Sequence, residues 1–397
     1  MKLYKVRQKI NTTRIEDVYA ACRQSIDASG IFSPVKAGER VCVGLPSRGI
    51  SAMKDVLRAS IDALKEHGAE VFLVPAMGSH GGGTAAGQKD VLEGYGFTEA
   101  ELGVPILSSM ETVSLGETSI PEHETSMRVV WDQFAAGADH VLVINRIKEH
   151  TAFSGRYESG LMKILSVGLG KAQGAKLIHG HDLEYAIPVA AKHILATQSV
   201  LGGIAIVENG LHQAMVVEAI PAEKIPSREP ELLAMAREIL PRIPFDSLDV
   251  LVIRKIGKDI SGTGMDTNVI GKYRRNWGVA KPDYRRIVAL DLTDASHGNA
   301  TGVGFADVIT QKLYDKIDLK ATYLNCLTAG NFNGAKIPMV CENEEAAIGC
   351  ALTGFDREHV RLVVIESTLD LETMWVSEAL LGEVRERGWK IAEVNLF

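Results

Sequence analysis

The sequence lacks the features that mark membrane, secreted and nucleic-acid-binding proteins. None of its apolar runs reaches the length of a membrane span, and the N-terminal MKLYKVRQKI has no apolar signal-peptide core. The net charge of −7 comes without a basic block, which argues against nucleic acid as a partner. These absences predict a soluble cytoplasmic protein that binds neither a membrane nor nucleic acid.

Cysteine is scarce and shows no paired spacing. The chain has five cysteines and no C-x-x-C motif. An odd number of scattered cysteines fits reduced thiols in a cytoplasm better than a disulfide framework or a zinc site. The five residues are Cys22, Cys42, Cys326, Cys341 and Cys350.

The motifs of several common cofactor and hydrolase sites are also absent. GLGKAQG (168–174) is not a G-x-G-x-x-G, because it has one residue too many before its last glycine. The same segment fails as a P-loop, since alanine follows Lys171. There is no G-x-S-x-G and no H-E-x-x-H. Dinucleotide, P-loop and standard hydrolase chemistry therefore have no support in the sequence.

The sequence does contain a regular alternation of β-branched runs and helical patterns. Such alternation predicts βαβ units and a largely parallel sheet. The expected strands are 41–46, 71–76, 140–147, 201–209, 250–256, 286–292 and 360–367. The expected helices include 50–69, 158–170, 184–198, 302–316 and 373–388.

Length and a proline interruption predict two domains. A chain of 397 residues is too long for one small core, and LPRIPFDSLD (240–249) is the candidate linker. We therefore predict an N-terminal α/β domain over 1–243 and a C-terminal α/β domain over 244–397. Both would have mainly parallel sheets, with an active-site cleft between them.

Four places put polar, reactive side chains after expected strands, where an open α/β sheet forms its binding crevice. In GLPSRG, Ser47 and Arg48 precede a helix, and an arginine beside a helix N-terminus suits phosphate. The alternative there is a solvated turn. In GSHGGGT, His80 is a candidate general base and Thr84 a helix cap, although a lone loop histidine is often merely exposed.

The other two places follow the expected strand 140–147. In EHTAFSGRYESGLMK, His150 precedes a helix that carries Lys163. Lys163 lies off the apolar face of that helix, so it is either a solvated lysine or an amine in the crevice that can be modified covalently. In IHGH, His179 and His181 form a weak pattern for binding nickel, copper or zinc.

Taken in order, these elements resemble the nickel-dependent lactate racemase family. Its members carry an arginine after the first strand, a G-T/S-H loop, a strand ending in K-P-H, and S-G-G-R-K followed by a histidine sixteen residues past the lysine. The corresponding segments here are PSRG, GSHGG, IKEH and SGLMK, and His179 lies sixteen residues after Lys163. The resemblance covers most of residues 40–260.

The resemblance implies a metal cofactor. Lys163 would carry a nickel-pincer nucleotide joined through a thioamide, and His179 would complete the nickel coordination. Arg48, with Ser47 beside it, would contact the nucleotide phosphate. The implied partners include cofactor-maturation enzymes, and a chain made without them would lack the cofactor.

The resemblance also implies the reaction. The protein would be an isomerase, a racemase or 2-epimerase of a 2-hydroxy acid, which acts by reversible hydride transfer. His80 and His150 would be the acid/base pair, each removing the hydroxyl proton of one enantiomer.

Departures from the family pattern bear on the substrate. Three extra residues lie between His150 and Lys163, and Leu45 stands where an aspartate often precedes the arginine. In KDISGTGMDTNVIGK the family's tyrosine, glutamine and carboxylate-binding lysine have no clear counterpart. A larger or more polar 2-hydroxy acid, such as a sugar acid, would suit the residues present. The candidate substrate-binding residues are Lys258, Asp259, Thr263 and Asn268, with Asp266 and Lys272 as further polar groups.

Two functions of other classes stay open on the residues alone. The chain can be a non-catalytic binding protein for a small acid or nucleotide, for which His80 and His150 would be dispensable. It can also be a zinc hydrolase that uses His179, His181 and a third ligand. The sequence carries no signal for the oligomeric state.

Overall fold

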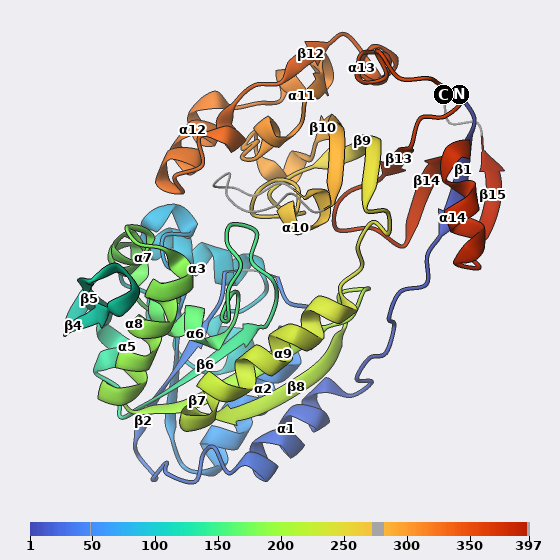
Figure 1. Cartoon of the computed structure of the whole chain (residues 1–397). Helices are drawn as coiled ribbons and strands as arrows, with labels where there is room; N and C mark the ends of the chain where they lie inside the picture. The colour runs from blue at the N-terminus through green and yellow to red at the C-terminus, as the bar shows by residue number, and fades with distance from the viewer. Residues whose placement is uncertain (48, 272–281, 395–397) are drawn as a thin grey trace. The chain divides into compact units, whose positions relative to one another are not determined.

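The computed structural model describes residues 1–47, 49–271 and 282–394, and the chain divides into two compact units (Figure 1). Both units are α/β with mainly parallel sheets, so the predicted fold class is confirmed. Unit 1 comprises Met1–Ile10, Thr151–Phe153 and Pro241–Phe397. Unit 2 comprises Asn11–His150 and Ser154–Leu240.

Unit 2 is built on a five-stranded sheet of order β3-β2-β6-β7-β8. Its strands are parallel except β8, which pairs antiparallel with β7. The strands are β2 (Arg40–Leu45), β3 (Glu70–Pro75), β6 (His140–Arg146), β7 (Val200–Glu208) and β8 (Ala214–Pro221). Four of these coincide with runs expected from the sequence.

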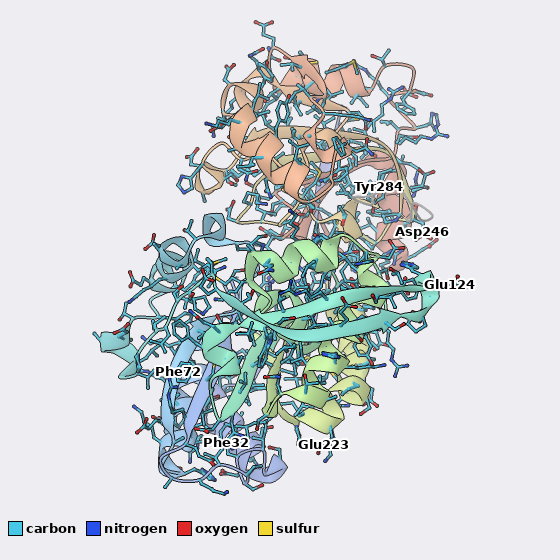
Figure 2. All side chains as sticks on the ribbon, turned by 90° about the vertical axis from the view of Figure 1, so that its left-hand side faces the viewer. Phe32, Phe72, Glu124, Glu223, Asp246 and Tyr284 are labelled. Atoms are coloured by element: carbon cyan, nitrogen blue, oxygen red, sulfur yellow. The ribbon has the colours of Figure 1, made fainter. Side chains whose placement is uncertain are left out.

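The helices of unit 2 connect these strands. They are α1 (Val18–Ser29), α2 (Met53–Glu66), α3 (Ala85–Gly94), α4 (Glu99–Leu102), α5 (Gln133–Ala136), α6 (Leu161–Lys163), α7 (Lys171–His179), α8 (Leu183–Thr197) and α9 (Ile225–Ile239). A separate antiparallel hairpin joins β4 (Thr112–Ile120) to β5 (Thr125–Asp132). Figure 2 shows Glu124 at its turn, where the backbone has a left-handed φ of 48°.

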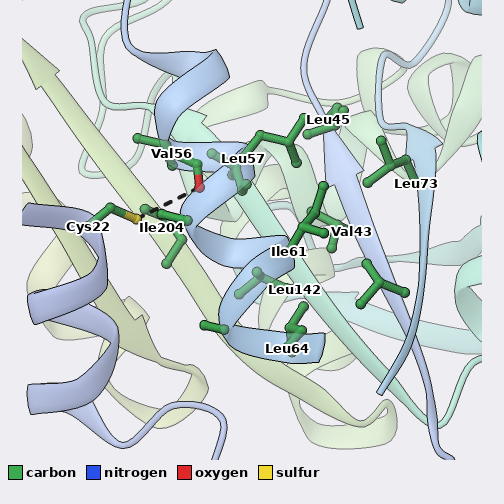
Figure 3. Packing of buried hydrophobic residues seen from close by; sticks show 14 of the residues in the cluster. Cys22, Val43, Leu45, Val56, Leu57, Ile61, Leu64, Leu73, Leu142 and Ile204 are labelled. Carbon is green, nitrogen blue, oxygen red and sulfur yellow. Dashed lines mark hydrogen bonds between the residues drawn. The ribbon is translucent and has the colours of Figure 1, made fainter. Parts of the chain in front are cut away.

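One face of the five-stranded sheet packs against α1 and α2. Alternate strand residues such as Val43 and Leu142 face this core, as the side-chain period of two requires (Figure 3). They meet Leu57 and Ile61 of α2, which are almost fully buried. Burying each such side chain contributes about 2 kcal/mol. The amphipathic pattern of α2 therefore contributes to the stability of this face.

The opposite face carries the segment that contains Lys163. A Cβ on Gly203 would lie 2.8 Å from the side chain of Leu161, and one on Gly44 would lie 3.6 Å from that of Leu169. Both leucines are fully buried. Glycines in β2 and β7 thus let α6 and the turn after it lie close to the sheet.

Unit 1 contains an eight-stranded sheet of order β12-β11-β10-β9-β13-β14-β1-β15. Its strands are β1 (Leu3–Arg7), β9 (Ser247–Ile256), β10 (Asp283–Leu292), β11 (Val308–Thr310), β12 (Met339–Cys341), β13 (Leu362–Ile365), β14 (Thr373–Ser377) and β15 (Lys390–Val394). Its helices are α10 (Thr267–Ile270), α11 (Gln311–Asp315), α12 (Leu319–Thr328), α13 (Glu344–Ala351) and α14 (Leu381–Glu386).

The helices predicted over 302–316 and 373–388 in unit 1 are wrong over part of their length. Residues 303–310 form a short 3-10 turn and β11, and the helix α11 begins only at Gln311, capped by Thr310. Residues 373–377 form β14, which pairs with β13 and β1. In both places an apolar run with helical spacing is also short enough to be a buried strand, and pairing with neighbouring strands decides the outcome.

The N-terminus also differs from the predicted domain division. Residues 1–10 were expected in the N-terminal domain, but β1 pairs antiparallel with β14 and β15 in unit 1. Leu3 and Val6 are buried there. These two residues, three positions apart, belong to different core clusters, as expected for a strand buried on both faces of its sheet, and only the long-range pairing identifies the partners of the strand.

All five cysteines are free thiols in the structure, and three of them are buried. Burial raises the pKa of Cys22 to about 12, so this thiol is not ionised at neutral pH. Within residues 1–47, 49–271 and 282–394, no helix has both the length and the apolar character needed to cross a membrane.

The backbone of β7 predicts a sharp intolerance to substitution at Gly202. Its φ of 148° disfavours other residues, and a Cβ would lie 2.1 Å from the carbonyl oxygen of Ile220. We expect Gly202→Ala to lower the free energy of unfolding by about 3 kcal/mol, measured by urea denaturation. Gly94→Ala is the matched control, because a Cβ there meets nothing within 4 Å. Equal stabilities of the two variants would contradict this view of β7.

Candidate active site

Three of the expected site residues follow neighbouring parallel strands at one edge of the sheet. Ser47 follows β2, His80 follows β3 and His150 follows β6. The chain runs from β2 to β3 on one side of it and then crosses to β6 on the other side, so the strand order reverses beside β2. Open α/β sheets bind ligands outside the carboxyl ends of strands at such a switch point. With strands about 4.8 Å apart, the ends of β3 and β6 are separated by about 10 Å.

Ser47 and His80 are in direct contact. The Oγ of Ser47 hydrogen-bonds Nδ1 of His80, and Tyr95 donates from its hydroxyl to the carbonyl oxygen of Ser47 over 3.2 Å. A hydroxyl can donate to Nδ1 or accept from it, so the second ring nitrogen can take up or release a proton. Arg48, the expected phosphate ligand, lies outside the described residues, as does Lys272.

The loop that carries His80 is held by a buried glutamine. Gln88, which is fully buried, donates from Nε2 to the carbonyl oxygens of Gly78 (2.8 Å) and His80 (3.3 Å). Thr84 accepts a hydrogen bond from the N–H of Gly87, which confirms its predicted role as the cap of α3. The imidazole of His80 is thus exposed, while the backbone that carries it is held by hydrogen bonds from Gln88.

Lys163 is not a solvated lysine. Its Nζ lies 2.5 Å from Nε2 of His150, and both side chains are half-buried. The structure therefore brings together the residue expected to tether a cofactor and one of the two expected proton-transfer residues.

The loop between these two residues is organised by one buried carboxylate. Glu158 is 2% exposed and accepts from the N–H of His150 (2.5 Å), the N–H of Gly155 (3.1 Å) and Arg237 Nη2 (2.5 Å). An antiparallel bridge between residues 148 and 159 closes the base of the loop. The three extra residues relative to the family spacing therefore lie in a closed loop, and Glu158 ties His150 to its end.

A second buried carboxylate holds the beginning of the helix that carries Lys163. Glu229 of α9 is 1% exposed, and its Oε2 accepts from the N–H of Met162 over 2.9 Å. A Cβ on Gly160 would lie 2.2 Å from Oε1 of Glu229, so only glycine fits there. Burial raises the pKa of Glu229 to about 7, against the backbone donors at Met162 and Leu161, which favour the charged form.

The helix continues past Lys163 as a π-helical turn, Ile164–Gly168. Fully buried Trp131 of the β4–β5 hairpin donates from Nε1 to the carbonyl oxygen of Leu165 over 2.9 Å. Such turns often occur at functional positions, because they change the direction of the helix where a side chain must be placed. The hairpin thus supports the segment after Lys163.

Lys171 is a buried ammonium group that links this segment to the His80 loop. Its Nζ donates to the carbonyl oxygen of Pro75 (2.6 Å) and to Oε1 of Gln88 (3.2 Å). It also forms an ion pair with Asp132, in which Nζ lies 3.1 Å from Oδ2. The angles of this contact do not meet those of a hydrogen bond. Burial lowers the pKa of Lys171, and Asp132 opposes that change. Its φ of 54° is left-handed, a strain that the buried contacts hold in place.

The two histidines of IHGH lie at the end of α7. His179 is the last residue of that helix and is half-buried, and His181 follows after one residue. Among the described residues, no three His, Cys, Asp or Glu side chains are grouped so that they could hold a metal ion. The zinc-hydrolase alternative, which needs three protein ligands, therefore finds no support in this part of the chain.

The candidate substrate residues belong to unit 1. Lys258 Nζ donates to the carbonyl oxygen of Gly262 (2.7 Å) and to Asn325 (2.8 Å), and Asp259 accepts from Thr293 (2.5 Å). Their side chains are therefore fixed by their neighbours.

Thr263 has a structural role in the same segment. Thr263 is fully buried and donates from its hydroxyl to the carbonyl oxygen of Met265 over 2.7 Å. Asn268 lies in α10, whose N-terminus is capped by Asp266.

The four supporting residues Glu158, Glu229, Lys171 and Gln88 were not found by sequence reasoning. The sequence around Lys171 identifies it only as part of a segment that does not match a P-loop. For Gln88 and Glu229 the sequence offers a weak signal, a polar residue at a buried position of a helix, and Glu158 lies in a loop that offers none. Most of the contacts that give these residues their roles span long stretches of sequence, for example 67 residues from Glu229 to Met162 and 96 from Lys171 to Pro75, so no local motif contains them.

The fold is similar to a known structure. The apoprotein of lactate racemase from Thermoanaerobacterium thermosaccharolyticum superposes with a TM-score of 0.56 over 94% of this chain and 99% of that chain. The sequences are 11% identical, so the likeness concerns the fold. No protein-family model matches the sequence, and no curated protein matches it. The chain thus has the α/β architecture of lactate racemase over nearly its whole length.

The raised pKa of Glu229 predicts a pH-dependent stability. Between pH 4.5 and 7 the unfolded chain loses this proton while the folded protein keeps it, so the free energy of unfolding falls as pH rises. By pH 8 the loss amounts to about 3 kcal/mol. Glu229→Gln removes the titration, so its stability relative to wild type should rise by about that amount between pH 5 and pH 8 in urea denaturation.

Glu231→Gln is the control for this experiment. Glu231 lies on the exposed side of the same helix and pairs with Arg228. Its replacement should change stability by less than about 0.5 kcal/mol at either pH. A Glu229→Gln variant with the same pH profile as wild type would refute a protonated buried carboxyl.

The contacts of Lys171 predict a large loss of stability on its replacement. Lys171→Met leaves Asp132, Pro75 and Gln88 without their buried donor, which should cost about 3–5 kcal/mol in chemical denaturation. Adding Asp132→Asn should restore part of that loss, since the amide oxygen can still cap α5. Lys176→Met on the exposed side of α7 is the control, and equal stability of the two lysine variants would contradict the prediction.

Proposed function

We propose that this protein is a racemase or 2-epimerase of a 2-hydroxy acid that works with a nickel-pincer nucleotide on Lys163. The observation that carries the proposal is the arrangement of two histidines at the ends of the strands on either side of β2, one of them in contact with Lys163. The likeness in fold to lactate racemase over nearly the whole chain supports it.

The donors present suit such a cofactor. Lys163 offers a half-buried amine that can form an amide or thioamide, and His179 offers an imidazole, a ligand that nickel accepts readily. The pincer group brings its own donors to the metal, so a cluster of three protein ligands is not required. Ser47 and Arg48 at the end of β2 would hold the phosphate.

Two histidines that follow the strands on either side of β2 suit racemisation, because the two enantiomers present their hydroxyl groups in different directions. The cofactor, when bound, supplies the carbon that accepts and returns hydride. The chain's own task is to remove the hydroxyl proton from either enantiomer and to return it afterwards. We assign one enantiomer to His80, oriented by Ser47, and the other to His150, oriented through Glu158.

We propose a polar substrate, such as a sugar acid, rather than lactate. Lys258 would bind the carboxylate as a cation, and Asp259 and Asn268 would bind hydroxyl groups. The buried hydroxyl of Thr263 would act indirectly, by shaping the turn through its bond to Met265.

A non-catalytic binding protein on the same fold is the second candidate. It would be favoured if His80→Ala and His150→Ala kept full affinity for a 2-hydroxy acid that the wild-type protein never converts.

The proposed function predicts a specific modification and a specific isotope result. Made together with cofactor-maturation enzymes, the chain should carry one nickel and a mass adduct on Lys163, detected by intact-mass spectrometry. A screen of 2-hydroxy acids in deuterated water should find a substrate that is racemised with its Cα hydrogen retained.

Variants separate the roles of the residues. His80→Ala should lower the rate by a factor on the order of 10²–10⁴ and keep the adduct, and Lys163→Arg should lose both. Lys192→Met, on an exposed position of α8, should behave as wild type. An unmodified Lys163 without nickel under these conditions would rule out the proposal.

A further inference from the structure

The contact between His150 and Lys163 points to a task for His150 that precedes catalysis. We propose that His150 is the base that takes a proton from the ammonium group of Lys163 and so makes its amine a nucleophile toward an activated carboxylic or thiocarboxylic acid. The inference rests on the proposed function for the identity of the natural acyl group, and on geometry for the reactivity of the amine.

The distance between the two nitrogens limits their protonation. An ammonium group has no lone pair, and neither does the Nε2 of a protonated imidazole. At 2.5 Å between Nζ and Nε2, one of the two groups must supply a lone pair to the other. The ammonium form of Lys163 and the imidazolium form of His150 therefore do not coexist in this contact. Transfer of a proton from Nζ to Nε2 turns the ammonium group into the free amine.

Buried carboxylates fix both members of the pair. Glu158, 2% exposed, accepts the N–H of His150, and Glu229, 1% exposed, accepts the N–H of Met162 beside Lys163. The backbone at each end is thereby held, and the contact does not rest on two flexible side chains meeting at a surface. Its persistence is what a proton transfer before acylation requires.

The second lysine of this segment shows the opposite environment. Lys171 faces the carboxylate of Asp132 and two oxygen acceptors, groups that favour an ammonium ion. Lys163 faces an imidazole nitrogen, a neutral base with a lone pair. Two lysines eight positions apart are thus suited to different tasks, one to carry charge and the other to react.

The acylation step balances as follows. The ammonium gives one proton to Nε2 of His150, which passes it to solvent. The amine lone pair then forms a bond to the acyl carbon, and the bond from that carbon to its leaving group breaks with the electron pair on the leaving group. A second nitrogen proton departs with the leaving group, and the third stays on the amide. Nothing is oxidised or reduced.

The apo protein and a simple acylating reagent test this proposal. The protein is treated with limiting succinimidyl acetate at neutral pH, and acetylation of Lys163 relative to exposed Lys192 is followed by peptide mass spectrometry. His150→Gln keeps an oxygen that can accept from the amine but cannot take its proton. We expect it to lower the Lys163/Lys192 rate ratio by a factor on the order of 100, the lower end of what a general base contributes.

Controls and the contrary result are defined on the same ratio. His359→Gln, at an exposed histidine of unit 1 paired with Asp356, should leave the ratio unchanged. Unchanged acetylation of Lys192 and an unchanged melting temperature show that His150→Gln is folded. A fall of less than about threefold in the Lys163/Lys192 rate ratio overturns the proposal, because a general base contributes far more than that, and any larger fall supports it. The assay uses neither nickel nor substrate, so its failure leaves the racemase proposal standing, and failure to load nickel leaves this inference standing.

Discussion

The buried ion pair of Lys171 and Asp132 is the interaction on which the candidate site depends. Burying an ammonium ion is costly unless it is paired and hydrogen-bonded, so the chain must bring acceptors to it. Those acceptors come from the end of β3, from α3 and from the end of β5. Through Gln88 the same network reaches the carbonyl oxygen of His80. One cation thus ties the loop of a proton-transfer residue to the start of α7.

Two further buried carboxylates extend the same principle to the other side of the site. Glu158 and Glu229 accept backbone N–H groups, so they position a main chain and leave the reactive side chains to make other contacts. Burying a charged carboxylate lowers the stability of the fold, and at Glu229 burial accordingly raises the pKa. The benefit is geometry, since side chains on a fixed backbone need little reorganisation to react.

The sequence predicted the parts of this structure that depend on local pattern. Hydrophobic runs identified β2, β3 and β6, and placing His80 and His150 after parallel strands brought them to one edge. Pairing over long distances was beyond that reasoning: β1 pairs with β14 and β15, which lie more than 300 residues away in sequence, and residues 373–377 become β14 because of their neighbours. The supporting carboxylates were missed for the same reason, since Glu229 acts on Met162 from 67 residues away.

The closed loop between residues 148 and 159 has a consequence for how the chain can change in length. Its two ends are joined by the backbone bridge, and His150 is tied to Glu158 near its far end. Residues inserted or deleted at its tip therefore leave both ends where they are, because the bridge and the carboxylate set the separation and the number of intervening residues does not. The number of residues between the histidine and the lysine is therefore a poor criterion for homology. In related proteins, the residues that close the loop are the ones to align first, and the distance along the chain from histidine to lysine can drift.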